Sequence, residues 1–146
     1  MPSITLLITP TGPLLTAVVL VSSPMRAALQ KAGKLIPAPV QCQLLVDTGA
    51  SITCVDPSII SKLQINPTSD TIIQTPSTAG NGHTCYQYDI GLFIPTGSGL
   101  LHMADPLPIV ATSFAGQGIQ GLIGRDILQR ACMFYNGAAG NYTLAF

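Results

Sequence analysis

Charged side chains are scarce in this sequence of 146 residues, which has six Lys and Arg, six Asp and Glu, and a formal net charge of zero. The charged fraction of 8% is about a third of the usual value. No basic stripe is available to neutralise phosphates, so nucleic-acid binding is excluded. The scarcity of basic residues also excludes a basic surface that binds acidic substrates and a polybasic segment that binds membranes.

Long apolar runs are also missing. No stretch reaches the roughly 18 uninterrupted apolar residues of a transmembrane helix. Leu14–Val21 has the length of a signal-peptide core, but no Lys or Arg precedes it, and Pro10, Gly12 and Pro13 interrupt the approach. The sequence therefore predicts a soluble chain without a membrane segment.

Cysteine and histidine are too few and too dispersed to build a metal centre. The four cysteines lie far apart in the sequence: Cys42, Cys54, Cys85 and Cys132. Without a Cys-x-x-Cys pair, zinc, a thioredoxin-type site and a dense disulfide framework are disfavoured, so we predict buried free thiols and favour a cytoplasmic location. His83 and His102 accompany no Ser or Cys nucleophile signature, and we expect surface or loop histidines, no metal and no cofactor.

What the chain does contain is enough apolar material for one folded domain over residues 1–146. Hydrophobic residues make up 47% of the sequence, which excludes intrinsic disorder. A chain of this length buries about two-thirds of its unfolded surface. With so few charges to cover the remainder, part of the apolar surface stays outside the monomer, and we expect an oligomer.

Short segments rich in Val, Ile, Leu and Thr, separated by Gly, Pro and Asn, predict an all-β domain. The predicted strands span residues 4–9, 14–22, 40–46, both arms of 71–94, 100–103, 108–110, 132–135 and 142–146. Turn residues Pro10–Pro13 predict that the first two strands form a hairpin. A hairpin around Pro76–Gly82, a turn at Asp105-Pro106 and a last hairpin around Asn136-Gly137 follow.

Two short helices are predicted. The first spans Ser23–Gly33, with Ser23 as N-cap, Pro24 at the first helical position and Gly33 at the end. The second spans Arg125–Ala131.

The segment Asp47-Thr48-Gly49-Ala50-Ser51 follows three apolar residues, so it places a carboxylate where a buried strand breaks into a tight turn. Alone this pattern is weak, because Asp, Thr and Gly are all common in turns. A second segment, Gly121-Leu122-Ile123-Gly124-Arg125-Asp126, places Gly124 77 residues after Asp47 and just before the second predicted helix.

The two segments together resemble the retropepsin-like aspartic proteases. The resemblance covers about Leu14–Phe146 and implies a closed β-barrel-like monomer with a flap hairpin and one or two short helices. In that family the glycine that matches Gly124 lets the chain pass close to the aspartate loop, which a residue without Cβ permits. The helix at Ser23–Gly33 is more similar to cellular and bacterial members than to compact retroviral enzymes.

The resemblance implies a role for each matching residue. Asp47 is the catalytic residue, Thr48 and Gly49 form the active-site loop, and Gly124 and Arg125 give structural support. The implied substrate-binding residues are Ala50, Ser51, Ala79, Gly80 and Asn81. In the family's mechanism, two carboxylates lie together and share one proton. One Asp-Thr-Gly in 146 residues therefore implies a homodimer with one Asp47 from each subunit.

One departure concerns Arg125. Retroviral members often carry an Asp after the D-T-G-A segment that pairs with this arginine, whereas this chain has Ser51. Asp56, Asp126 or backbone carbonyls could take its place as the partner. The remaining acids, Asp70, Asp89 and Asp105, are predicted to lie in turns or to face solvent.

We therefore expect an aspartic endopeptidase that cleaves extended, mostly apolar segments of a peptide or protein substrate without a metal or cofactor. The alternative is a catalytically silent peptide-binding and dimerisation module on the same fold. A generic β-barrel with an accidental motif would instead be a monomer that tolerates replacement of Asp47.

Overall fold

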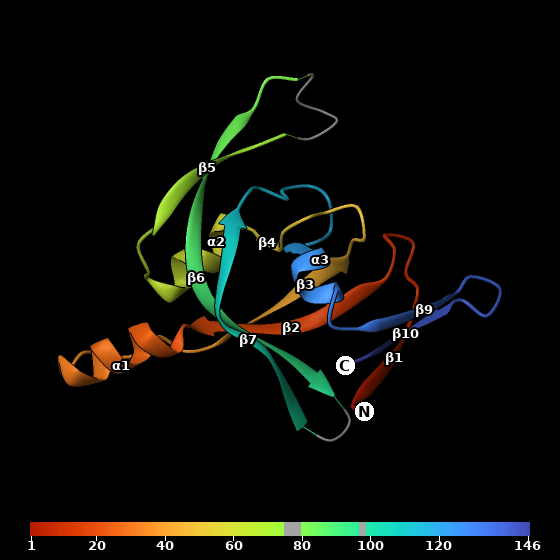
Figure 1. The fold of residues 1–146 in the computed structure, drawn as a ribbon, viewed down its shortest axis with the longest axis horizontal. Coiled ribbons are helices and arrows are strands. Elements are labelled where there is room, and N and C mark those ends of the chain that lie inside the picture. Colours follow the sequence, from red (N-terminus) through yellow and green to blue (C-terminus); the bar gives the residue numbers. More distant parts are fainter. Residues whose placement is uncertain (75–79, 97–98) are drawn as a thin grey trace.

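The computed structural model describes residues 1–74, 80–96 and 99–146. Six strands form a ring whose neighbours are hydrogen-bonded (Figure 1). Their spatial order is β2 (Leu14–Val21), β3 (Val40–Val46), β8 (Gly121–Ile123), β4 (Cys54–Val55), β7 (Gly99–Ala111) and β6 (His83–Thr96). Because β6 also pairs with β2, the ring closes. The predicted all-β class and closed barrel are confirmed.

The barrel interior is the main hydrophobic core. Alternate residues of β2 point into it, and Leu15, Ala17 and Val19 are fully buried. Leu44 of β3 and Ile123 of β8 are buried in the same cluster. The central strands therefore hold the residues that precede Asp47 and Gly124 in a packed environment.

A second, antiparallel sheet contains β1 (Ser3–Leu7), β10 (Asn141–Ala145) and β9 (Cys132–Asn136) in that order. Tyr142 of β10 is fully buried, and its hydroxyl donates to the carbonyl of Leu14, which links this sheet to the barrel. Burial raises the pKa of Tyr142 to about 12. The β9–β10 pairing confirms the predicted last hairpin.

The predicted first hairpin is wrong. A tight turn does exist, because Thr9 and Gly12 exchange backbone hydrogen bonds of 3.0 and 2.9 Å. The strands on either side then separate: β1 pairs with β10, whereas β2 pairs with β3 and β6. Local turn residues are correct here, but long-range pairing decides where each strand goes.

The predicted turn at Asp105-Pro106 is also wrong. Both residues lie inside β7, which runs without a break from Gly99 to Ala111, and the peptide bond between them is cis. Between the pairs Ile90–Leu107 and Leu92–Ala104, two residues of β7 oppose one of β6. This β-bulge accommodates the proline within the ladder.

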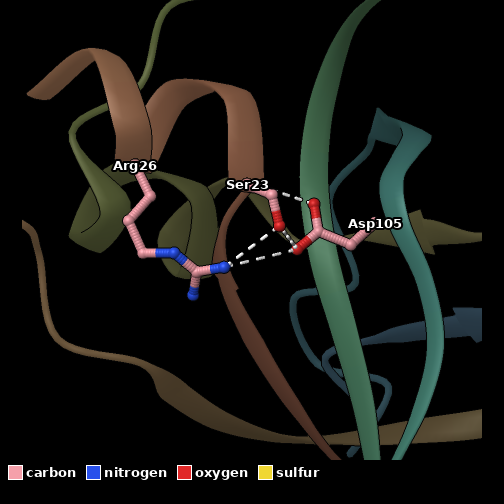
Figure 2. A network of polar contacts seen from close by, with 3 residues as sticks. All are labelled: Ser23, Arg26 and Asp105. Atoms are coloured by element: carbon pink, nitrogen blue, oxygen red, sulfur yellow. Dashed lines mark hydrogen bonds and ion pairs between the residues drawn. The ribbon is translucent and has the colours of Figure 1, made fainter.

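Asp105 does not face solvent, contrary to the prediction, because its side chain is 2% exposed. Figure 2 shows that its carboxylate meets the start of α1 (Ser23–Lys31). It accepts the backbone N–H of Ser23 at 2.6 Å and the Ser23 hydroxyl at 2.5 Å, and Arg26 Nη2 lies 3.8 Å away. Ser22, the residue before the helix, makes no side-chain cap, so β7 supplies the cap for α1. Of the other two acids, Asp70 is exposed as predicted and Asp89 is half-buried.

The helices agree with the sequence in part. The first predicted helix is α1, which ends before Gly33, a residue with φ +64°. The second is α3 (Arg125–Leu128), shorter than expected. Within the described ranges, no helix is long and apolar enough to span a membrane.

The helix α2 (Pro57–Leu63) was not predicted from the sequence. Asp56 caps it by accepting the N–H of Ser58 at 2.9 Å, and Pro57 stands at its start. Its residues Ile59, Ile60 and Leu63 are buried in the core. An Asp-Pro pair followed by apolar residues at helical spacing is a sequence signal for the start of a helix.

Candidate active site

Asp47 lies just beyond the end of β3, where the parallel β3–β8 pairing brings two chain segments side by side. Its backbone N–H donates to the carbonyl of Ile123 at 3.0 Å. Its half-buried side chain accepts the N–H of Gly49 through Oδ1 at 2.8 Å, and its carbonyl accepts the N–H of Ala50 at 3.3 Å. The carboxylate is thus fixed by its own turn.

Gly49 packs closely against the Asp47 carboxylate. A Cβ at this position would lie 3.0 Å from Asp47 Oδ1. That distance is shorter than an ordinary contact, so a side chain here would displace the carboxylate.

Arg125 holds the same loop from outside. Its Nη1 donates to the carbonyls of Thr48 and Gly49 at 2.9 and 3.1 Å, and its backbone N–H donates to Ala50 O at 2.9 Å. Of the three kinds of partner predicted for this guanidinium, the structure shows backbone carbonyls.

The two acids considered as partners of Arg125 bind other groups. Asp126 accepts the backbone N–H of Thr53 at 2.9 Å and the Thr53 hydroxyl at 2.8 Å. Asp56 accepts the N–H groups of Phe114 and Ser58, and these hydrogen bonds, with Phe114 the largest contribution, hold its pKa below the usual value.

Thr53 lies beneath the active-site loop and is fully buried. Besides its two hydrogen bonds to Asp126, its Oγ1 accepts the N–H of Gly124 at 3.2 Å. One side chain therefore ties the segment after Asp47 to the start of α3. The role of Thr53 was not predicted from the sequence. A threonine within the otherwise apolar segment Ile52–Val55 is the one sequence feature that indicates a buried hydroxyl there.

Gly124 packs directly against that segment. A Cβ built on it would lie 2.5 Å from Ile52 C, 2.7 Å from Ile52 O and 2.9 Å from Thr53 N. All three neighbours are backbone atoms. Gly124 of the second motif thus packs against the residues that directly follow the first motif.

A cleft of about 640 Å³ opens beside Asp47. Of the sequence-predicted residues, Asp47, Gly49, Ala50 and Ser51 line it. The remaining walls come from the following residues: Ile52, Cys54, Ile73, Gln74, His83, Cys85, Thr112, Ser113, Phe114, Gln117 and Leu122. The cleft therefore lies between the aspartate loop and the hairpin of β5 (Ser69–Ile73) and β6.

Other predicted site residues lie outside the lining. Thr48 is exposed in the aspartate loop, and Gly80 and Asn81 are exposed near the end of the β5–β6 hairpin. Ala79 falls outside the described residues. Arg125 and Gly124 support the loop without lining the cleft.

Two cysteines lie in the floor of the cleft. Cys54 and Cys85 are buried there beside Phe114. Burial, reinforced by the charge of Asp126, raises the pKa of the Cys54 thiol to about 11, so this thiol stays protonated. Cys42 is buried in the barrel core, and burial raises its pKa to about 12. Cys132 departs from the prediction of four buried thiols, because it is exposed on β9.

His83 is a further cleft residue that the sequence analysis placed on a surface or loop. It begins β6 and lies at the cleft wall. The side chain of His102, the other histidine, falls outside the described part of the chain. Among the described residues, no group of three His, Cys, Asp or Glu side chains could hold a metal ion.

A closed barrel, an Asp-Thr-Gly turn at a cleft and a glycine packed beneath it define one lobe of the aspartic-protease type. Residues 38–127, more than half of the chain, match a family model described as aspartyl protease. The chain therefore belongs to the aspartyl protease family.

Solved structures agree with this assignment at the level of the fold. One of them is the crystal structure of a retropepsin-like aspartic protease from Rickettsia conorii, with 14% sequence identity and a TM-score of 0.58. The alignment covers 97% of this chain and 89% of that chain. A search of curated proteins gives no match. The fold is retropepsin-like, and the family supports a peptidase.

Proposed function

We propose that this chain is an aspartic endopeptidase that works as a homodimer, with residues 1–146 as its single domain. The observation that carries the proposal is the Asp47 carboxylate, fixed in a tight turn at the edge of an open cleft. Asp47 is the sole carboxylate among the described residues that line this cleft. The chemistry needs a second carboxylate, which a second copy of the chain supplies.

In the dimer, two Asp47 side chains hold one water between them. The ionised carboxylate takes a proton from the water while the protonated one polarises the carbonyl of the scissile peptide bond. The two groups share one proton and titrate as a pair. Gly49 and Ala50 leave room for the substrate backbone beside the reacting carbonyl.

The sheet formed by β1, β10 and β9 supports the second copy. Its fifteen residues, five in each strand, include no charged side chain. Leu7 and Phe134 are large and apolar, yet 74% and 63% exposed. β9 pairs only with β10 among the described strands, so its other edge offers free backbone groups to a partner. Thr48 would then meet its counterpart across the twofold axis.

The substrate is an extended, largely apolar peptide segment. The cleft floor of Ile52, Cys54, Phe114 and Leu122 suits an apolar side chain. The β5–β6 hairpin covers the cleft from the other side, and Ala79, Gly80 and Asn81 would close over the bound peptide as a flap.

The test compares the wild type with Asp47→Asn, which keeps an acceptor for the Gly49 N–H. Both proteins are incubated with a diverse peptide mixture from pH 3 to 7, and cut sites are read by mass spectrometry. Sedimentation equilibrium checks that both are dimers. Cleavage by the wild type alone supports the proposal.

Two results would overturn it. Equal cleavage by Asp47→Asn would remove Asp47 from the chemistry. No cleavage by a folded wild-type dimer would favour the silent peptide-binding module instead.

A further inference from the structure

The cleft has an unusual charge composition. Among its described lining residues, Asp47 is the one carboxylate and His83 is the one side chain that can carry a positive charge. The other titratable groups facing the cleft are the thiols of Cys54 and Cys85, which carry no positive charge in any state. A charged substrate side chain therefore meets either an aspartate or this histidine.

The strand pattern directs His83 toward the substrate. It pairs with Ile73 of β5, and Ile73 also lines the cleft. Two residues further along β6, Cys85 lines the same cleft, whereas the intervening Thr84 is exposed outside it. Since alternate residues of a strand share a face, His83 and Cys85 point to the cleft side of the hairpin.

The imidazole is available for a ligand. His83 is exposed, and no side-chain hydrogen bond or ion pair joins its ring to another residue in the described part of the chain. Its position at the cleft rim, above an apolar floor, suits a substrate residue next to the apolar one that fills the floor.

The net charge of the complete cleft then depends on this histidine. In the proposed dimer, two Asp47 carboxylates that share a proton carry a single negative charge. When both His83 imidazoles are protonated, their two positive charges outweigh it and the cleft is positive. When both imidazoles are neutral, the cleft is negative.

We propose that His83 is a specificity-determining residue that selects peptides carrying a carboxylate side chain, Glu or Asp, beside the apolar residue at the cleft floor. The effect of His83 on cleavage rests on the proposed function, whereas its effect on peptide binding does not. An exposed charge pair of this kind changes a rate or binding constant by about two- to fivefold.

The experiment uses pairs of peptides that differ only in Glu or Gln at one position, scanned along the segment. The ratio of kcat/KM for the two members is measured at pH 5 and pH 7 for wild type, His83→Gln, His83→Lys and the control Thr84→Gln. In the wild type and the control, we expect one position with a ratio of about two to five at pH 5. His83→Gln abolishes the preference at both values, and His83→Lys keeps it at both.

A second measurement separates this inference from the proposed catalysis. The same peptides, fluorescently labelled, are bound to Asp47→Asn and followed by anisotropy. Selective binding that His83→Gln removes supports the inference even without any cleavage, in which case only the catalytic proposal fails. A Glu preference unchanged by His83→Gln, or no Glu preference in either assay, overturns the inference.

Discussion

Replacing Gly124 with alanine tests whether its close contact with the backbone of Ile52 and Thr53 stabilises the fold. Gly124 has φ −91° and ψ −178°, an extended conformation that alanine adopts freely, so backbone strain contributes nothing. The added methyl group, however, would lie 2.5 to 2.9 Å from three backbone atoms of Ile52 and Thr53. Ordinary carbon contacts begin at about 3.5 Å.

The size of the effect follows from these distances. The two segments must separate by roughly 0.6 to 1.0 Å, since no flexible side chain is present to give way. Overpacking of this kind costs about 1–3 kcal/mol. The separation also stretches the hydrogen bond of 3.2 Å from Gly124 N–H to Thr53 Oγ1, for about 1 kcal/mol more. We expect a loss of about 2–4 kcal/mol in the free energy of unfolding.

Gly137→Ala is the matched control. A Cβ there would meet only Tyr135 Cε1 at 3.5 Å, an ordinary contact, and we expect a change within about 0.5 kcal/mol. Both variants are unfolded in urea at one protein concentration, because oligomerisation makes apparent stability depend on concentration. If Gly124→Ala unfolds within about 0.5 kcal/mol of Gly137→Ala, close packing at Gly124 does not limit stability and the reasoning is refuted.

Other features give further predictions. Thr53→Val removes the hydroxyl that is hydrogen-bonded to both Asp126 and Gly124, and it should lower the free energy of unfolding in urea by about 1–3 kcal/mol. Thr53→Ser keeps the hydroxyl and should retain most of this stability. Equal losses in the two variants would contradict the role of the hydroxyl. The pKa of Asp56 is lower in the folded state than in the unfolded state, where it is about 3.9. The ionised Asp56 therefore contributes its full stabilisation of the fold above the unfolded-state pKa and loses it as pH falls through the folded-state pKa. Asp56→Asn should flatten the dependence of the free energy of unfolding on pH in that acid range, and an unchanged dependence would refute this. Iodoacetamide at pH 8 should modify Cys132 first in folded protein diluted to the monomer, because it is the exposed cysteine of the single chain, and mass spectrometry showing earlier labelling of a buried thiol would contradict this.

The two motifs could be read from the sequence because each has a local physical cause. A carboxylate after a buried apolar run, and a glycine before a short helix, are visible without any long-range information. Four of the barrel strands, β2, β3, β6 and β7, overlap segments that the apolar patterns predict, and β3 has the predicted bounds. The two short barrel strands β4 and β8 were not predicted.

The errors concern partners that lie far away in the chain. The turn at Pro10–Pro13 exists, but the partner of β1 is more than 130 residues distant, and no local pattern encodes that pairing. Asp105-Pro106 has the composition of a turn, but the pair lies in a β-bulge of β7. The Asp105 carboxylate therefore reaches and caps a helix that begins 82 residues earlier in the chain. The partner of Arg125 stayed open for the same reason, because backbone carbonyls leave no signature in a sequence.

In the candidate active site, Asp47 and its turn could be predicted from the sequence, but most of the other residues that line the cleft could not. His83, Cys54 and Cys85 enter the cleft only because β4 and β6 flank β7 in the ring. Thr53 acquires its role through hydrogen bonds to residues about 70 positions later. Such roles arise from topology, which single residues do not reveal.

The pairing of β1 with β10 also has a consequence for biosynthesis. Ser3 pairs with Ala145, and the backbone N–H of Phe146 donates to the carbonyl of Pro2 at 3.0 Å. Figure 1 shows β1 beside β10. Within residues 1–146, β1 is synthesised before the barrel strands and its partner β10 after them, so the barrel strands can fold before this sheet is complete. Since that sheet is the proposed dimer surface, the proposed dimer would assemble only after β10 has been synthesised.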